Sequence, residues 1–206
     1  MRGPSCANPC LATSLHLSLS FARMLAFDLE TTGPDPLRDD ITCAAVYDPQ
    51  AGVERFFLFS PKSRLDDPEE FMLLLDSADR LCAFNGARFD IPLIQRCFQA
   101  PPARVAAWRL KLHDVFEACK LALDVTFSLQ SLLELNCMAG KTGSGADAVK
   151  MAEEGWWDQL GMYCLNDTRQ THRVSSLDKI LLPRTKGICL SGAGMFFAES
   201  QERSLF

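Results

Sequence analysis

The segment Phe27–Gly33, with the sequence FDLETTG, follows the apolar residues Met24–Ala26 and places two carboxylates two positions apart. In a β-strand such residues share one face, so Asp28 and Glu30 would project together from a strand that is otherwise apolar. Two unpaired charges at this spacing repel each other and resist removal from water. The segment therefore favours a strand that carries a divalent cation, although a strand with a solvated polar face would show the same alternation.

Two further acidic motifs occur downstream, the segment 85–90 (NGARFD) and the segment 163–167 (YCLND). Taken alone, Asp90 is explained as a carboxylate that favours the first turn of a helix. Tyr163 alone is explained as the edge of an amphipathic core, and Asp167 as an ordinary surface residue. The occurrence of all three motifs in this order is more specific than any single motif, and it favours a catalytic interpretation.

The composition allows a single domain with a real hydrophobic core, since 48% of the 206 residues are hydrophobic. A formal net charge of −5 argues against binding nucleic acid through a general basic coat. It does not exclude a nuclease, because bound cations present positive charge to a phosphate. The 9 cysteines show no zinc-finger spacing and are typical of core residues in a reducing compartment.

The N-terminal composition differs from the rest of the chain. Residues 1–23 contain no acid, two arginines, four serines and one threonine, which is typical of an organelle transit peptide, a disordered extension or a misplaced start codon. We expect the domain itself at residues 24–182 and a C-terminal tail at 183–206. No apolar run approaches the ~20 residues needed to cross a bilayer, so the sequence predicts a soluble, intracellular protein.

The order of predicted elements indicates an α/β fold. Three strands at Met24–Glu30, Ile41–Tyr47 and Val53–Phe59 are joined by short turns and predict an antiparallel meander. Strands and helices alternate after that, which predicts a mixed sheet with helices on both faces. The further predicted elements are a helix from about residue 67, a strand at Leu81–Phe84, a helix to about Phe98, an extended run at Arg109–His113, helices at Val115 and at Ser128–Asn136, and a long helix at Trp156–Ile180.

Together the three acidic motifs resemble the DEDD superfamily of 3′–5′ exonucleases, which includes proofreading exonuclease domains. The spacing of Tyr163 and Asp167 resembles the tyrosine subgroup, since Met162 stands where the histidine subgroup would have histidine. The similarity extends from about Met24 to Lys179. It implies a ribonuclease-H-like three-layer sandwich with a mixed, mostly five-stranded sheet and helices on both faces.

The same resemblance implies roles for five residues. Asp28, Glu30, Asp90 and Asp167 would bind two divalent ions, and Tyr163 would position the attacking water. Oxygen ligands alone suit Mg²⁺ or Mn²⁺ better than zinc. Two such ions can activate a water and stabilise the leaving oxygen of a phosphodiester. A phenol with an ordinary pKa of about 10 is a poor base, so its expected role is orientation.

Four residues resemble family positions near the terminal nucleotide and are candidates for substrate binding: Thr31, Thr32, Asn85 and Phe89. Turn formation by Asn-Gly, a buried aromatic side chain and strand-end hydroxyls explain the same residues equally well. Lys141, in a glycine-rich loop, is either a phosphate contact or a solvated lysine.

Asp114 and Glu117 fit the N-terminal capping pattern of a helix, so they are predicted to begin a helix rather than to bind metal.

The resulting hypothesis is a metal-dependent 3′–5′ exonuclease that acts on the 3′ end of single-stranded DNA or RNA. Two alternatives remain open: a phosphodiesterase for short oligonucleotides, and a catalytically silent nucleic-acid-binding or scaffold domain of the same fold. Four clustered carboxylates argue against the silent domain, because without metal they repel phosphate.

Overall fold

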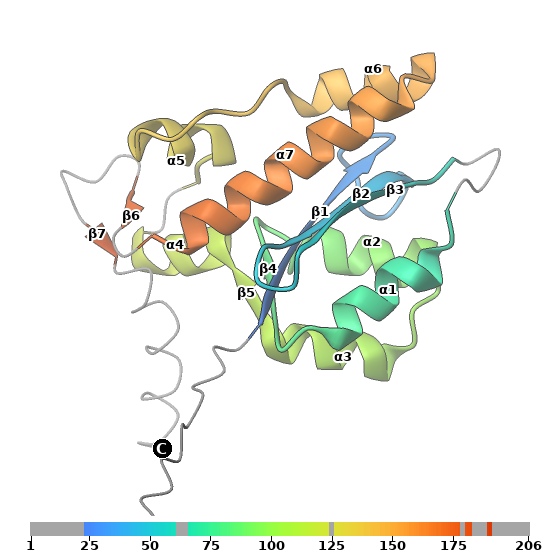
Figure 1. The fold of residues 1–206 in the computed structure, drawn as a ribbon, viewed down its shortest axis with the longest axis horizontal. Coiled ribbons are helices and arrows are strands. Elements are labelled where there is room, and N and C mark those ends of the chain that lie inside the picture. The colour runs from blue at the N-terminus through green and yellow to red at the C-terminus, as the bar shows by residue number, and fades with distance from the viewer. Residues whose placement is uncertain (1–22, 61–65, 124–125, 178–179, 183–188, 191–206) are drawn as a thin grey trace, which may run out of the picture.

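A mixed five-stranded sheet forms the centre of the computed structural model, which describes residues 23–60, 66–123, 126–177, 180–182 and 189–190 (Figure 1). The strands are β1 (Met24–Thr31), β2 (Ile41–Asp48), β3 (Val53–Leu58), β4 (Arg80–Ala83) and β5 (Leu112–Asp114). Their order in the sheet is β3-β2-β1-β4-β5. The first three strands form the predicted antiparallel meander, and β4 and β5 run parallel to β1.

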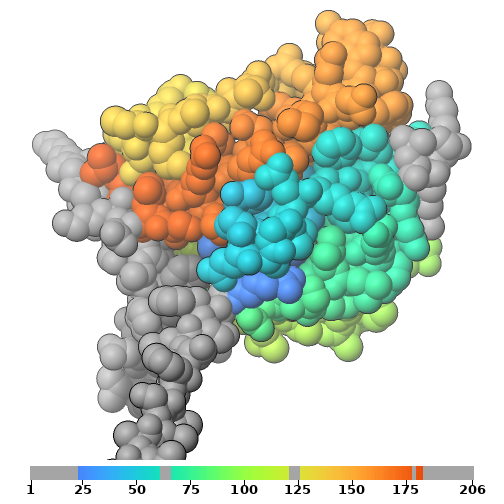
Figure 2. All heavy atoms as spheres, in the orientation of Figure 1, coloured from blue at the N-terminus to red at the C-terminus, as the bar shows by residue number. Residues whose placement is uncertain are grey.

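Helices cover both faces of this sheet (Figure 1). On one face lie α1 (Pro68–Ser77), α2 (Asp90–Cys97) and α3 (Pro102–Lys111). On the other face lie α4 (Val115–Leu123), α5 (Leu129–Leu135), α6 (Gly145–Glu154) and α7 (Trp157–Ser175). In the space-filling view α7, in orange, lies against the cyan strands of the meander (Figure 2). The predicted three-layer α/β architecture is therefore confirmed.

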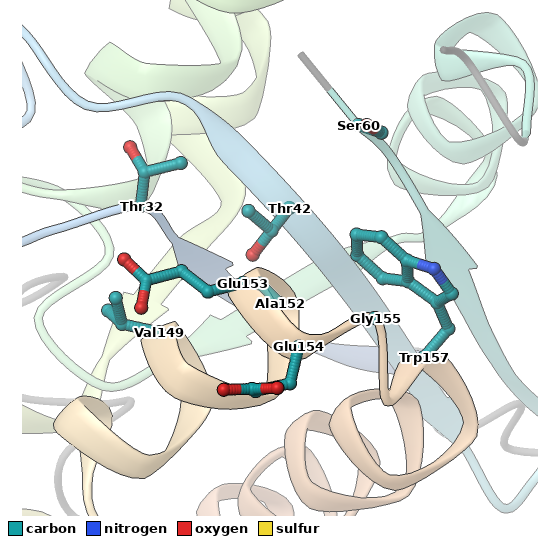
Figure 3. Close-up of a pocket in the computed structure, with 9 residues that line it drawn as sticks. All are labelled: Thr32, Thr42, Ser60, Val149, Ala152, Glu153, Glu154, Gly155 and Trp157. Carbon is teal, nitrogen blue, oxygen red and sulfur yellow. The ribbon is translucent and has the colours of Figure 1, made fainter. Parts of the chain in front are cut away.

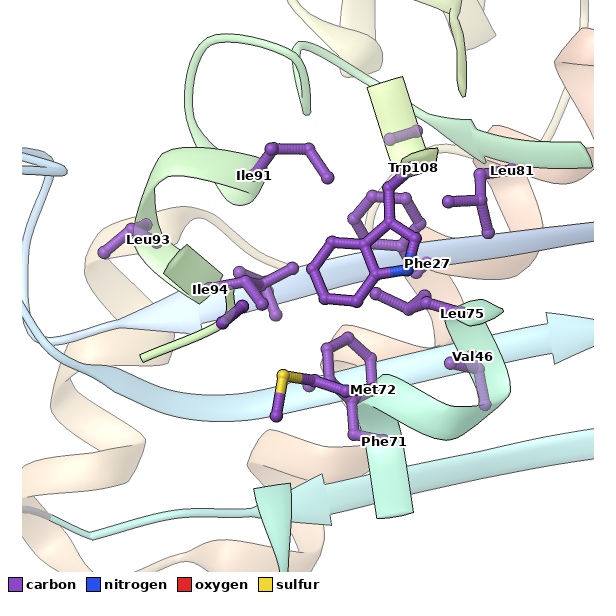
Figure 4. Packing of buried hydrophobic residues seen from close by; sticks show 14 of the residues in the cluster. Phe27, Val46, Phe71, Met72, Leu75, Leu81, Ile91, Leu93, Ile94 and Trp108 are labelled. Atoms are coloured by element: carbon purple, nitrogen blue, oxygen red, sulfur yellow. The ribbon is translucent and has the colours of Figure 1, made fainter. Parts of the chain in front are cut away.

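The alternation of side chains along β1 separates the hydrophobic core from the acidic residues. Phe27 and Leu29 point into the cluster formed with α1, α2 and α3, where Phe27 packs near Leu75, Leu81 and Trp108 (Figure 4). Phe27 and Trp108 are fully buried. Because the side chains of a strand alternate between its two faces, the residues between them face α7 instead. This places the carboxylates between the sheet and one long helix.

The structure corrects the prediction of an extended run at Arg109–His113. Helix α3 continues to Lys111, and the strand β5 begins only at Leu112. The helix begins at Pro102, where proline is favoured because its fixed φ suits the first turn and its missing N–H costs nothing there. Val105 and Trp108, three residues apart, form its buried stripe.

Three other boundaries differ from the prediction. Helix α6 was not predicted, although Ser144 and Asp147 form its capping box and Gly155 ends it with a φ of 75°. Helix α7 ends at Ser175 instead of Ile180. A small antiparallel pair was not predicted: β6 (Ile180–Leu181) begins where the long helix was predicted to end, and β7 (Cys189–Leu190) lies in the predicted C-terminal tail.

The first described residue, Arg23, contacts the domain: its Nε lies 2.7 Å from Oδ2 of Asp48, and its backbone N–H donates to Asp79. The expectation for residues 1–22 lies outside the described residues. Within the described ranges, no helix combines the length and the apolar composition needed to span a membrane.

Candidate metal centre

Strand β1 and helix α7 supply three of the four predicted acids. Asp28 and Glu30 lie on the face of β1 that α7 covers, as their spacing predicts. The pairing of β1 with β2 shifts register between Glu30 and Thr31, so the ladder becomes irregular where the acidic pair ends. Irregularities of this kind are common beside active sites because they redirect side chains. Glu30 is buried and Asp28 is partly buried.

Helix α7 presents Tyr163 and Asp167 to the same region. The two residues are four positions apart, which puts them one turn apart on one side of a helix. Both side chains are buried, and Asp167 is fully so. The negative charge of Asp167 raises the pKa values of Asp28, Glu30 and Tyr163, so the four groups lie close enough to interact electrostatically. The helix thus delivers a carboxylate and a phenol to the acidic pair.

Asp90 enters from the turn that follows β4, as the first residue of α2, and its side chain is only 3% exposed. The turn depends on Gly86. A Cβ at that position would lie 2.5 Å from the Cβ of Ala83 and 3.3 Å from Oδ2 of Asp90. Glycine therefore lets the backbone pass close to the carboxylate of Asp90.

Asp114 holds the same turn in place from β5. Its carboxylate accepts four backbone hydrogen bonds: from Asn85 and Ala87 at 2.9 Å each, from Phe116 at 3.0 Å and from Glu117 at 3.2 Å. The last two lie in the first turn of α4 and confirm the predicted helix start. Asn85 has a φ of 65°, a conformation that Asn tolerates in turns. The carboxylate of Asp114 is therefore used structurally and braces the turn that carries Asp90.

The pKa values of all four acids are raised above their ordinary values. Burial and then the charge of Asp167 raise the pKa of Asp28 to about 7. Burial and then the charge of Asp28 raise the pKa values of Glu30 and Asp90 well above the usual range. Burial also raises the pKa of Asp167, although Lys141 opposes the shift. Because burial and mutual repulsion both disfavour the ionised forms, these four carboxylates can all be ionised only when positive charge lies nearby.

Lys141 brings a positive charge to these carboxylates. Its Nζ lies 2.5 Å from Oδ2 of Asp167 and 5.4 Å from the centre of the Tyr163 ring. Burial lowers the pKa of this amine, but Asp167 and Asp28 outweigh burial and raise it. Its backbone N–H donates to Oε1 of Gln130 at 2.6 Å, which fixes the loop. This pairing with Asp167 was not predicted, because the glycine-rich sequence around Lys141 indicates only a phosphate contact or a solvated lysine.

The donors at this centre fit a hard divalent cation. Four carboxylates supply the oxygen ligands that Mg²⁺ and Mn²⁺ prefer. Oδ1 of Asp90 is buried and accepts no hydrogen bond from the described residues. A buried acceptor without a partner is costly, and a cation would satisfy it. Asp28 and Glu30 also appear in a group of donors whose ligand atoms lie within 4.8 Å of one another; the third member is Cys164.

A cavity of about 590 Å³ opens beside Glu30. Thr31, Thr32 and Phe89 line it together with the start of α6, whereas the predicted substrate residue Asn85 is not among its lining residues. The hydroxyls of both threonines bond within their own loop, Thr31 to the Gly33 carbonyl and Thr32 to Asp39.

A second cavity of about 440 Å³ shares the lining residues Thr32 and Val149 with the first, so the two lie next to each other along α6. Glu153, Glu154 and Trp157 also line the second cavity (Figure 3).

The chain belongs to the RNase_H superfamily, whose family model matches residues 25–177. This membership supports a nuclease-type function in general. The solved structure of the family B DNA polymerase from the hyperthermophilic archaeon Pyrobaculum calidifontis is similar over 73% of this chain, with a TM-score of 0.58 and 19% sequence identity. The match covers 24% of the polymerase chain, so the similarity concerns one part of that protein and shows a shared fold. No curated protein sequence matches the chain significantly.

The raised pKa of Asp28 predicts how stability depends on pH in the absence of metal. An acid whose pKa is raised on folding binds its proton more tightly in the native state, so deprotonation destabilises that state. In EDTA, the free energy of unfolding should fall as the pH rises from the ordinary value of 3.8 through about 7. Asp28→Asn should flatten this fall and be the more stable protein above pH 7. Urea denaturation across that window measures both slopes, and equal slopes would contradict the assignment.

Proposed function

We propose that this protein is a metal-dependent 3′–5′ exonuclease of the tyrosine subgroup of the DEDD superfamily, acting on the 3′ end of single-stranded DNA or RNA. One observation carries the proposal: the carboxylates of Asp28, Glu30, Asp90 and Asp167, from β1, α2 and α7, interact electrostatically with one another, and Tyr163 lies one helical turn from Asp167. Superfamily membership supports the same conclusion.

In this proposal Asp28, Glu30, Asp90 and Asp167 hold two divalent ions, Mg²⁺ or Mn²⁺. Such ions, when bound, supply an acidified water and charge stabilisation at the leaving oxygen. Tyr163 orients the attacking water. Burial, and then the charge of Asp167, raises the pKa of Tyr163 above its ordinary value, so its phenol stays protonated and acts as a hydrogen-bond donor rather than a base.

The cavity beside Glu30 supports binding of a chain end. Phe89 is partly exposed and lines this cavity, so its ring can stack against a terminal base. The start of α6 borders the same space, where the backbone N–H groups of a helix favour an anion such as a phosphate. Thr31 and Thr32 shape the wall between them, and their hydroxyls are used chiefly within the loop. Asn85 contributes by forming the turn before Asp90.

Lys141 has a positioning role in this proposal, because it pairs with Asp167 and lies over the ring of Tyr163. Lys141→Met should lower hydrolysis by about 10- to 100-fold, the usual cost of removing a group that orients a metal ligand. Lys141→Arg should recover part of the loss by restoring the charge. The exposed Lys150 on α6 offers a matched control, and Lys150→Met should keep the wild-type rate. If Lys141→Met hydrolyses substrate at the wild-type rate, Lys141 has no positioning role.

Incubation of 5′-labelled single-stranded DNA and RNA with Mg²⁺, Mn²⁺ or EDTA tests the proposed function. We expect metal-dependent ladders that shorten from the 3′ end and are absent in Asp28→Asn. A series of lengths separates an exonuclease from a phosphodiesterase for short oligonucleotides, whose rate would collapse as the substrate lengthens. Binding of nucleic acid without cleavage by folded protein would instead support the silent domain.

A further inference from the structure

A cysteine lies inside the candidate metal centre. Cys164 follows Tyr163 on α7 and is fully buried. Its Sγ and one carboxylate oxygen each from Asp28 and Glu30 lie within 4.8 Å of one another. The same Sγ is 3.5 Å from the backbone carbonyl oxygen of Asp28. The thiol is thus held against β1 at the two acids, with no role in the proposed hydrolysis.

A second observation points to a ligand at this place. Asp90 is 3% exposed, and its Oδ1 has no hydrogen-bond partner among the described residues. Its carboxylate interacts with the backbone N–H of Leu29, the residue between Asp28 and Glu30 on β1, so it lies next to the acidic pair but outside the group of donors within 4.8 Å of one another. That group supplies one sulfur and two carboxylate oxygens, and Zn²⁺ at catalytic sites keeps three protein ligands and one open position.

Sulfur and oxygen donors select different cations. Mg²⁺ and Mn²⁺ prefer oxygen, whereas thiolate ligands bind Zn²⁺ and other thiophilic ions strongly. We propose that Cys164, Asp28 and Glu30 form a binding site for a thiophilic divalent cation, and that this cation competes with Mg²⁺ or Mn²⁺ for the same carboxylates. On binding, the Cys164 thiol loses its proton to solvent and a metal–sulfur bond forms.

Zn²⁺ bound by Cys164, Asp28 and Glu30 blocks catalysis, because these two carboxylates are then no longer available to Mg²⁺ or Mn²⁺. Zn²⁺ is therefore an inhibitor of Mg²⁺-dependent hydrolysis. The inhibition rests on the proposed exonuclease function, but the binding does not. A measurement of binding keeps the two separable.

Cd²⁺ is the probe for the binding itself, since its bond to thiolate gives an ultraviolet charge-transfer band. The full-length protein is titrated under reducing conditions as wild type, Cys164→Ala, Asp28→Asn and Cys82→Ala. Cys82 is the matched control, because it is a second fully buried cysteine and packs on β4 in a different cluster. The other cysteines contribute equally to all four titrations. We expect the tightest component of the band to be lost in Cys164→Ala and in Asp28→Asn, and to persist in Cys82→Ala.

Three results would overturn the proposal: a band unchanged in Cys164→Ala, a band lost there but unchanged in Asp28→Asn, or a band that depends on Cys82. The amide circular dichroism spectrum of each variant establishes that it is folded. If the wild type hydrolyses nucleic acid, Zn²⁺ should inhibit it at least about tenfold more weakly in Cys164→Ala, as expected for loss of one strong ligand. If it does not, the Cd²⁺ titration still decides the binding site.

Discussion

Asp167→Asn is expected to lower phosphodiester hydrolysis by about 10³-fold or more at neutral pH. The substitution keeps the shape of the side chain but removes the charge of a proposed metal ligand at a fully buried position, where it also pairs with Lys141. Metal ions supply several kcal/mol of transition-state stabilisation, and each 1.36 kcal/mol corresponds to about a factor of ten in rate. Initial rates on end-labelled single strands at saturating Mg²⁺ measure the loss.

Helix α7 provides a matched control for this experiment. Asp158 lies in the first turn of the same helix and is exposed, so Asp158→Asn should keep the wild-type rate. Asp167→Asn should remain folded without metal, because burial already disfavours its charge. If Asp167→Asn hydrolyses substrate as fast as Asp158→Asn, Asp167 is not a metal ligand of the reaction.

Trp108→Ala is expected to cost about 3–5 kcal/mol in the free energy of unfolding. Its ring is fully buried against the sheet, and its Nε1 donates to Oδ1 of Asp76 at 2.7 Å (Figure 4). The substitution leaves a cavity and an unpaired acceptor. Since small domains are stable by only about 5–15 kcal/mol, this loss is a large fraction of the total. Urea denaturation followed by far-ultraviolet circular dichroism measures it without relying on tryptophan fluorescence.

Leu110, two residues later on α3, is 87% exposed and serves as the control. Leu110→Ala should change the free energy of unfolding by no more than about 0.5 kcal/mol, as is usual for an exposed position. If Trp108→Ala does not fold, the milder Trp108→Phe is measured instead. A cost below about 1 kcal/mol for Trp108→Ala would mean that this side of the sheet is not the packed core described above.

The sheet was predictable because its signal is local. The alternation of Phe27, Asp28, Leu29 and Glu30 assigns the two faces of β1 without knowledge of the rest of the fold. The start of α4 was predictable for the same reason, since Asp114 caps residues close to it in sequence. The helices α3 and α6 also had local signals, a proline at the start and a capping box, but neighbouring prolines and glycines concealed them.

Contacts between distant segments were not predictable in this way. Asp114 also binds the backbone of Asn85, 29 residues earlier, and sequence spacing gives no indication of that contact. Lys141 meets Asp167 only because the glycine-rich loop passes beside α7. The position of Cys164 beside Asp28 and Glu30 likewise requires α7 to be packed on β1. Sequence motifs identified the acids themselves, whereas packing determined which other residues join them.

The most direct test of the central claim is a crystal structure of the wild-type protein grown with Mn²⁺, with anomalous scattering used to locate the ions. The four-carboxylate assignment predicts two anomalous peaks about 3.5–4 Å apart, bound by Asp28, Glu30, Asp90 and Asp167. If no Mn²⁺ binds these carboxylates and the amine of Lys141 is still paired to Asp167, the four-carboxylate assignment is contradicted.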